Sequence, residues 1–143
     1  MTFDAEFDAV ICLCQGAFGL MTANGNDVDV LMGIRRALKP GGHLALSAFS
    51  SYFAVKYHGA ASFDADSGVS HEVTEVKDES GRATEVDLWT GCYTPRELRM
   101  LMDKVDMTVD HIYSVEPGAY LPAPPTVESP EYLLIASATP FRR

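Results

Sequence analysis

The chain begins with a nearly continuous apolar run, and two similar runs follow it. Their residues are 7–14, 43–49 and 132–138. Runs that lack regular polar alternation are typical of strands buried on both faces of a sheet, as in proteins where helices cover both faces of parallel strands. The sequence therefore predicts an α/β fold.

A helix is predicted between the first two runs. Apolar residues recur at helical spacing over residues 28–38, and Asn26 or Asp27 can cap the start of the helix. Pro40 and the two glycines after it end the helix. A second helix begins at residues 94–97, where Thr-Pro-Arg-Glu forms a capping box with proline at the first helical position. Strand, helix and strand in this order are typical of parallel pairing.

Residues 69–89 have a different pattern. Polar and apolar residues alternate in two segments around the turn signal at 78–81, which predicts a half-exposed β-hairpin. The remaining segments are predicted from shorter signals: a short helix over 50–58, a mobile loop over 60–68, a strand over 107–115 and an extended proline-rich connection over 116–130.

Composition and charge limit the classes of partner. The chain has 143 residues, 47% of them hydrophobic, which fits a single domain over residues 1–143. A net charge of -9 argues against nucleic acid and anionic membrane as partners, and no apolar run has the length of a membrane span. Three cysteines, two of them in a predicted strand, indicate reduced thiols and a cytoplasmic location. No His or Cys cluster predicts a metal site.

The segment Leu38-Lys39-Pro40-Gly41-Gly42 ends the first helix and leads into a buried strand. This succession of strand, helix and strand resembles the fourth and fifth strands of class I S-adenosylmethionine-dependent methyltransferases. The resemblance implies a partial Rossmann-like sheet of strands four to seven, with strand seven antiparallel between five and six. It also implies that residues 59–92 are an inserted loop and β-hairpin that covers the substrate as a lid.

The resemblance further implies where the cofactor lies. In this family the end of the fourth strand contacts the methionine part of S-adenosylmethionine, which assigns cofactor binding to Cys14, Gln15, Gly16 and Phe18. Ligands of open α/β sheets bind at the carboxyl ends of the strands, which agrees with this placement and also predicts ligand contacts at residues 49–53 after the second strand. A plain turn from strand to loop at Gln15 and Gly16 is the alternative interpretation.

Acceptor contacts are expected in the lid and the short helix. His71 is the candidate catalytic base or substrate hydrogen-bonding group, and a solvated strand histidine is the alternative. Tyr52, Trp89 and Tyr93 are candidate substrate residues, Tyr57 could line the same pocket, and ordinary packing is the alternative for all four. Methyl transfer from a sulfonium mainly needs alignment of the reacting atoms, so a base is required only when the acceptor atom carries a proton.

The family's glycine motif, Gly-x-Gly-x-Gly, does not occur in this sequence, and the acidic residue that binds the ribose has no counterpart. We therefore expect the chain to be the C-terminal half of a methyltransferase for a small-molecule acceptor, with weak or absent cofactor binding on its own. By right-handed crossover both long helices are expected on one face of the sheet, which leaves the other face uncovered. The expected partner, joined at or near the strand of residues 7–14, is therefore a second copy in a twofold dimer or a missing N-terminal half. The alternative is a non-catalytic remnant that acts as a dimerisation or regulatory module.

Overall fold

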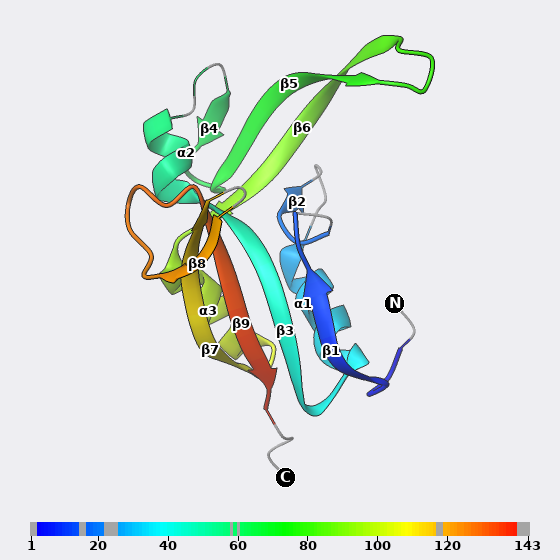
Figure 1. The fold of residues 1–143 in the computed structure, drawn as a ribbon, viewed down its shortest axis with the longest axis vertical. Coiled ribbons are helices and arrows are strands. Elements are labelled where there is room, and N and C mark those ends of the chain that lie inside the picture. Colours follow the sequence, from blue (N-terminus) through cyan, green and yellow to red (C-terminus); the bar gives the residue numbers. More distant parts are fainter. Residues whose placement is uncertain are drawn as a thin grey trace.

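The protein is an open mixed sheet with a long β-hairpin that extends beyond one end (Figure 1). The structure is a computed structural model that describes residues 3–14, 17–21, 26–57, 59, 61–116 and 119–139. The helices are α1 (Asp27–Ala37), α2 (Ser51–Tyr57) and α3 (Pro95–Lys104). The strands are β1 (Phe7–Cys12), β2 (Leu20–Met21), β3 (Leu38–Ser50), β4 (Ser62–Asp64), β5 (Val69–Lys77), β6 (Ala83–Tyr93), β7 (Met107–Glu116), β8 (Ala119–Ala123) and β9 (Glu131–Ala138).

The order of the central strands confirms the expected topology. β1 pairs parallel with β3, and β9 pairs antiparallel with β3 on one side and β7 on the other. The order β1-β3-β9-β7 is the one that the resemblance implies for strands four, five, seven and six. Leu46 is the centre of this arrangement, because it lies beside Cys12 of β1 and Leu134 of β9.

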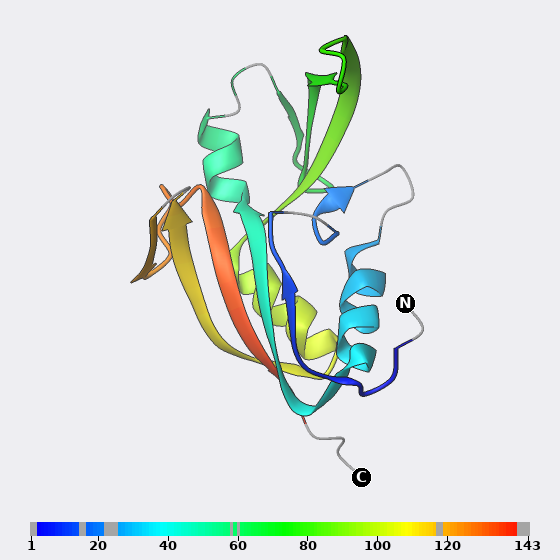
Figure 2. The same cartoon turned by 45° about the vertical axis from the view of Figure 1, so that its right-hand side comes forward.

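Both long helices pack against the same face of the sheet (Figure 2). Connections between parallel strands are right-handed. The connection from β1 to β3 contains α1 and that from β3 to β7 contains α3, and both run in the same direction across the sheet, so both helices lie on the same face. The core between helices and sheet consists of fully or almost fully buried side chains: Leu31 and Ile34 of α1, Leu98 and Met102 of α3, Leu44 and Leu46 of β3, and Leu134 and Ala136 of β9. Burial of each large apolar side chain contributes about 1.5–3 kcal/mol.

The opposite face of the sheet carries no helix from the described part of the chain (Figure 2). Val10 and Cys12 of β1 pack against the core, whereas Ile11 between them is 74% exposed. An apolar run is typical of a strand covered on both faces, and that general expectation is wrong for the described residues. The right-handed crossover rule places both long helices on one face and leaves the other face of the first strand uncovered, and the structure confirms this placement.

Local signals predicted the helix starts well. Asn26 caps α1 by accepting a hydrogen bond from the Val28 amide, and α1 ends at Ala37, just before the proline-glycine segment. Thr94 and Glu97 form both bonds of the capping box at the start of α3. The predicted short helix after the second strand is present as α2. Within the described residues no helix has the length and apolar character needed to cross a membrane.

Short strands were missed by the sequence analysis. The predicted loop at 60–68 contains β4, which pairs with β5, and the predicted connection at 116–130 contains β8, which pairs with β7. β2 lies in the loop after β1 and pairs with β6. Strands of two to five residues are too short for a periodic signal, and proline in β8 is tolerated because this is an edge strand.

The hairpin of β5 and β6 is expected to open before the sheet does. Residues 72–77 and 83–87 are all exposed, so few apolar contacts hold them, whereas the residues of β3 from 44 to 48 are mostly buried. In hydrogen exchange followed by mass spectrometry, the amides of 72–87 should exchange well before those of 44–48. Equal protection of the two segments would show that the hairpin is an integral layer of the fold.

The free edge of β1 is expected to make the purified chain self-associate. β1 pairs only with β3 among the described strands, and its exposed Ile11 lies beside unpaired backbone groups, a combination that favours pairing with a second strand. Replacing Ile11 with lysine should shift the chain from dimer to monomer in analytical ultracentrifugation. Met100→Lys on α3 is the control, since Met100 is also exposed but lies on a helix. A wild-type chain that sediments as a monomer would contradict the expectation.

Candidate functional site

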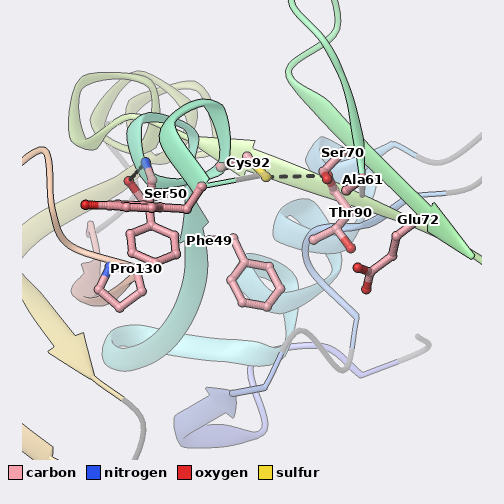
Figure 3. A pocket seen from close by; sticks show the side chains of 11 residues that line it. Phe49, Ser50, Ala61, Ser70, Glu72, Thr90, Cys92 and Pro130 are labelled. Atoms are coloured by element: carbon pink, nitrogen blue, oxygen red, sulfur yellow. Dashed lines mark hydrogen bonds between the residues drawn. The ribbon is translucent and has the colours of Figure 1, made fainter. Parts of the chain in front are cut away.

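A cavity lies at the carboxyl end of β3, between α2 and the base of the β5–β6 hairpin (Figure 3). Its volume is about 260 Å³. The residues that line it are Phe49, Ser50, Phe53, Ala54, Tyr57, Ala61, Ser70, Glu72, Thr90, Cys92 and Pro130. The carboxyl end of a parallel strand is where open α/β sheets bind their ligands, so this cavity is the candidate functional site.

Aromatic rings form one side of the cavity. Phe53 and Tyr57 lie one turn apart on α2, and their ring centroids are 4.6 Å apart. Phe49 lies on β3 just before α2 and is 37% exposed, although its neighbours Ala48 and Ser50 are buried. Figure 3 shows the Phe49 ring and Glu72 among the side chains that line the cavity. These rings provide a large apolar surface for a flat or compact ligand.

Polar groups of the hairpin form the other side. Ser70 lies directly opposite Thr90 in the β5–β6 pairing, and Glu72 and Cys92 follow on the same face because alternate strand residues point the same way. Glu72 is the only charged residue among the described residues that line the cavity. Burial raises the pKa of the Cys92 thiol to about 11, and the thiol donates to the Thr90 carbonyl at 3.7 Å. Cys92 is therefore a neutral wall residue at pH 7, without the thiolate needed for a nucleophile.

Hydrogen bonds at both ends hold α2 in place. The buried Ser50 hydroxyl lies 2.8 Å from the Tyr132 hydroxyl, and its oxygen also accepts a hydrogen bond from the Phe53 amide. At the other end the Tyr57 hydroxyl donates to Glu128 at 2.7 Å, and Lys56 forms an ion pair with the same carboxylate. A two-turn helix has little intrinsic stability, so these contacts fix the aromatic side of the cavity.

A second, smaller hollow of about 170 Å³ lies at the carboxyl end of β1. Cys14 lies there with a positive φ of 55°, and its amide donates to the Ser47 hydroxyl at 2.8 Å. Ser47 lines this hollow and Phe49 lines the larger cavity. The two residues are alternate positions on one face of β3, about 7 Å apart along an extended strand. The two hollows are therefore neighbours on the face of the sheet opposite α1 and α3.

Phe18 and Tyr93 are brought together, but inside the core. Phe18 is fully buried, and its ring stacks on Tyr93 with centroids 4.8 Å apart. Asp27 holds this segment against α1 by accepting a hydrogen bond from the Gly19 amide at 2.9 Å. The Tyr93 hydroxyl is buried and has no hydrogen-bond partner among the described residues. Neither ring lines the cavity.

The other predicted residues are dispersed. His71 stacks on Trp89 at 4.7 Å and its Nε2 lies 2.8 Å from Asp87. Both rings lie on the hairpin face opposite the one that Ser70, Glu72, Thr90 and Cys92 turn to the cavity, because neighbouring strand residues point to opposite faces. Tyr52 is exposed and lines a separate hollow beside Thr94. Gln15 and Gly16 lie outside the described residues. Among the candidates that the structure describes, Tyr57 lines the cavity and Cys14 lines the neighbouring hollow.

Sequence reasoning missed most residues of the cavity. Residues 49–53 were predicted to lie near a ligand because they follow the second strand, and Phe49, Ser50 and Phe53 do line the cavity. Glu72 was read as a hairpin position without a role. The alternation of the hairpin could have indicated that Glu72 faces the same side as Ser70. Only the pairing of Cys92 with Phe49 shows that this side faces the end of β3.

Solved structures provide the comparison that decides the fold. The methyltransferase CcbJ from Streptomyces caelestis aligns with a TM-score of 0.72 at 12% identity, covering 94% of this chain and 58% of that chain. An S-adenosylmethionine-dependent methyltransferase from Clostridium acetobutylicum aligns with a TM-score of 0.71 at 10% identity, covering 98% of this chain and 61% of that chain. The amino pentose methyltransferase CalS10 from Micromonospora echinaspora, with S-adenosylmethionine bound, gives a TM-score of 0.56 at 18% identity, covering 96% and 61%.

The chain has the fold of the S-adenosylmethionine-dependent methyltransferases. Comparison with family models and with curated proteins gives no match. The chain spans about three-fifths of the length of the three methyltransferases above, by the 58% and 61% coverage of their chains. At these identities the likeness shows the fold, and the activity has to be argued from the site.

The described residues do not form a complete site for S-adenosylmethionine. The Cys14 amide, the polar group best placed at the end of β1, already donates to Ser47. Leu13, Leu133 and Val115 make the adjoining hollow largely apolar. A cofactor with a charged amino acid end and an adenosine end needs more polar partners than these residues supply. The described residues also contain no cluster of three or more potential metal ligands.

The contact of α2 with Glu128 is expected to depend on pH. The hydrogen bond from Lys56, and then that from Tyr57, lowers the pKa of Glu128. A lowered carboxyl pKa stabilises the contact above the unfolded value of about 4.3, and the stabilisation is lost as the pH falls through the folded value. Relative to the intrinsic exchange rate at each pH, amides of 51–57 should therefore be less protected below about pH 4 than at pH 6.

Glu128→Gln is expected to lower the protection of the α2 amides already at pH 6. The midpoint of global unfolding should change little, because the Lys56–Glu128 ion pair is solvent-exposed. Glu116→Gln is a control, since Glu116 is exposed on β7 and its substitution removes the same charge at a different place. If both variants leave the exchange of α2 unchanged, Ser50 alone holds the helix.

Proposed function

We propose that this chain forms the acceptor-binding part of an S-adenosylmethionine-dependent methyltransferase that acts on a small molecule. The observation that carries the proposal is the position of the two hollows. Methyltransferases of this fold are expected to contact the cofactor at the carboxyl end of β1. The hollow there is lined by Ser47, and the aromatic cavity is lined by Phe49, two residues further along β3. A methyl donor and an acceptor must be held in such neighbouring sites for direct transfer.

The size and lining of the cavity support a small acceptor. A volume of about 260 Å³ lies just below the usual range for ligand pockets, about 300–1,000 Å³, so only a small ligand fits. A net charge of -9 does not favour a nucleic acid acceptor. One of the methyltransferases of the same fold acts on an amino pentose, as its name states, so the fold accommodates acceptors of this size.

Within this proposal, residues 59–92 act as the lid over the acceptor. The base of the hairpin supplies Ser70, Glu72 and Thr90 to the cavity, and the exposed outer part gives it freedom to move. His71 and Trp89 stay predictions for contacts made when the lid closes on a complete cofactor site. Cys14 keeps its proposed place at the methionine end of the cofactor.

The cofactor binding of the chain alone is expected to be weak. The sequence has no Gly-x-Gly-x-Gly, and the described residues at the end of β1 leave few free polar groups for the cofactor. Calorimetric titration of S-adenosylmethionine into the purified chain should give no binding signal at micromolar concentrations. A micromolar dissociation constant would show that residues 13–18 and the end of β3 contribute more than is assigned to them.

The proposal itself is tested on a longer product. The DNA upstream of the Met1 codon is read for an in-frame strand, glycine loop and helix, and the extended chain is titrated with S-adenosylmethionine in the same way. Micromolar binding by the extended chain, with none by the chain alone, is the expected result. A reading frame closed directly upstream, together with no binding in the presence of any co-purified partner, would overturn the methyltransferase proposal in favour of a non-catalytic module.

A further inference from the structure

We propose that the cavity at the end of β3 recognises an organic ammonium group, so that its ligand is a small ring compound bearing a protonated amine. The proposal rests on the proposed function only for the statement that this ligand is the methyl acceptor. The binding preference itself follows from the charges, rings and hydroxyl groups around the cavity, and it can be measured without the cofactor.

The described residues that line the cavity carry a net negative charge. Glu72 supplies a formal negative charge, and no Lys, Arg or His is present among the described residues that line the cavity. Glu72 forms no ion pair with a described residue, so its carboxylate is available to a ligand. The nearest basic side chain along α2 is Lys56, which is held in an ion pair with Glu128. The cavity therefore favours a cation.

Aromatic rings share the cavity with that carboxylate. Phe49, Phe53 and Tyr57 line it together with Glu72, and Figure 3 shows Phe49 and Glu72 among the lining side chains. The faces of aromatic rings attract an ammonium group because they carry partial negative charge. A carboxylate and aromatic rings in one cavity are the groups that recognise an amine attached to an apolar body.

The remaining polar groups agree with this assignment. Ser70 and Thr90 offer hydroxyl oxygens that can accept hydrogen bonds from an ammonium group. Cys92 stays a neutral thiol that donates a hydrogen bond to the Thr90 carbonyl, so it adds no charge to the cavity. An anionic ligand would lie near Glu72 without a cationic partner among the described lining residues. Desolvation of such an anion would then be uncompensated.

The test uses three probes that share a phenylethyl group and differ in charge: phenethylamine, 2-phenylethanol and 3-phenylpropionate. Each is titrated into the full chain at pH 7, and the shifts of backbone amides are followed by NMR. We expect the amine to bind most tightly and the carboxylate most weakly. The largest shifts should be at Phe49, Ser70 and Thr90, because these residues line the cavity.

Glu72→Gln keeps the size of the side chain and removes its charge. It should weaken phenethylamine binding about two- to fivefold, the range of an exposed ion pair, and leave 2-phenylethanol unchanged. Glu75→Gln is the matched control, because Glu75 is exposed on the same strand but does not line the cavity. Glu75→Gln should leave the binding of all three probes unchanged.

The outcomes separate this proposal from the proposed function. If the amine and the alcohol bind equally well, or if Glu72→Gln and Glu75→Gln weaken the amine equally, the ammonium assignment is wrong while the acceptor cavity stands. If no probe shifts the amides of the cavity, the ammonium assignment is wrong and the cavity loses its support as an acceptor site. Micromolar cofactor binding by the extended chain is measured separately and is independent of both results.

Discussion

The backbone pairing of β3 is the constraint on which the rest of the structure depends. This strand pairs in parallel with β1, antiparallel with β9 and, at its last two residues, in parallel with the end of β6. It thereby joins the sheet to the hairpin. Because side chains alternate along a strand, the same segment also serves two environments. Leu44, Leu46 and Ala48 fill the core, while Ser47 and Phe49 face the two hollows.

The placement of the helices explains why the hollows are accessible. Right-handed connections bring α1 and α3 to the same face, and the helices bury Leu44, Leu46 and Ala48 of β3 there. The other face keeps exposed apolar residues, among them Ile11, and contains both hollows at its upper end. The surface available to a ligand and the surface available to another strand are thus consequences of one topological rule.

The candidate site combines rigid and adjustable parts. Ser50 is buried and bonded to Tyr132, so the floor of the cavity belongs to the sheet. The aromatic wall is carried by a short helix whose far end is held by an exposed contact with Glu128. The polar wall belongs to a hairpin whose outer half buries little surface. A ligand can therefore change the positions of two walls without disturbing the core, which suits a site that closes around its acceptor.

The sequence by itself determined the elements with strong local signals. The capping box at Thr94 and the proline-glycine segment after Ala37 set the ends of helices, because both act through backbone geometry within a few residues. The succession around that proline-glycine segment also indicated the methyltransferase fold. The comparison with solved structures supports this fold.

Only the tertiary structure decided which of these residues meet. Alternation predicted the hairpin, but the pairing of Cys92 with Phe49 determined that Glu72 faces the cavity, with its neighbours His71 and Trp89 on the other side. Phe18, an expected cofactor residue, became a core side chain because Tyr93 stacks on it from a strand far along the chain. Local patterns depend on neighbours in sequence, whereas a site depends on strand register and on which face each helix covers.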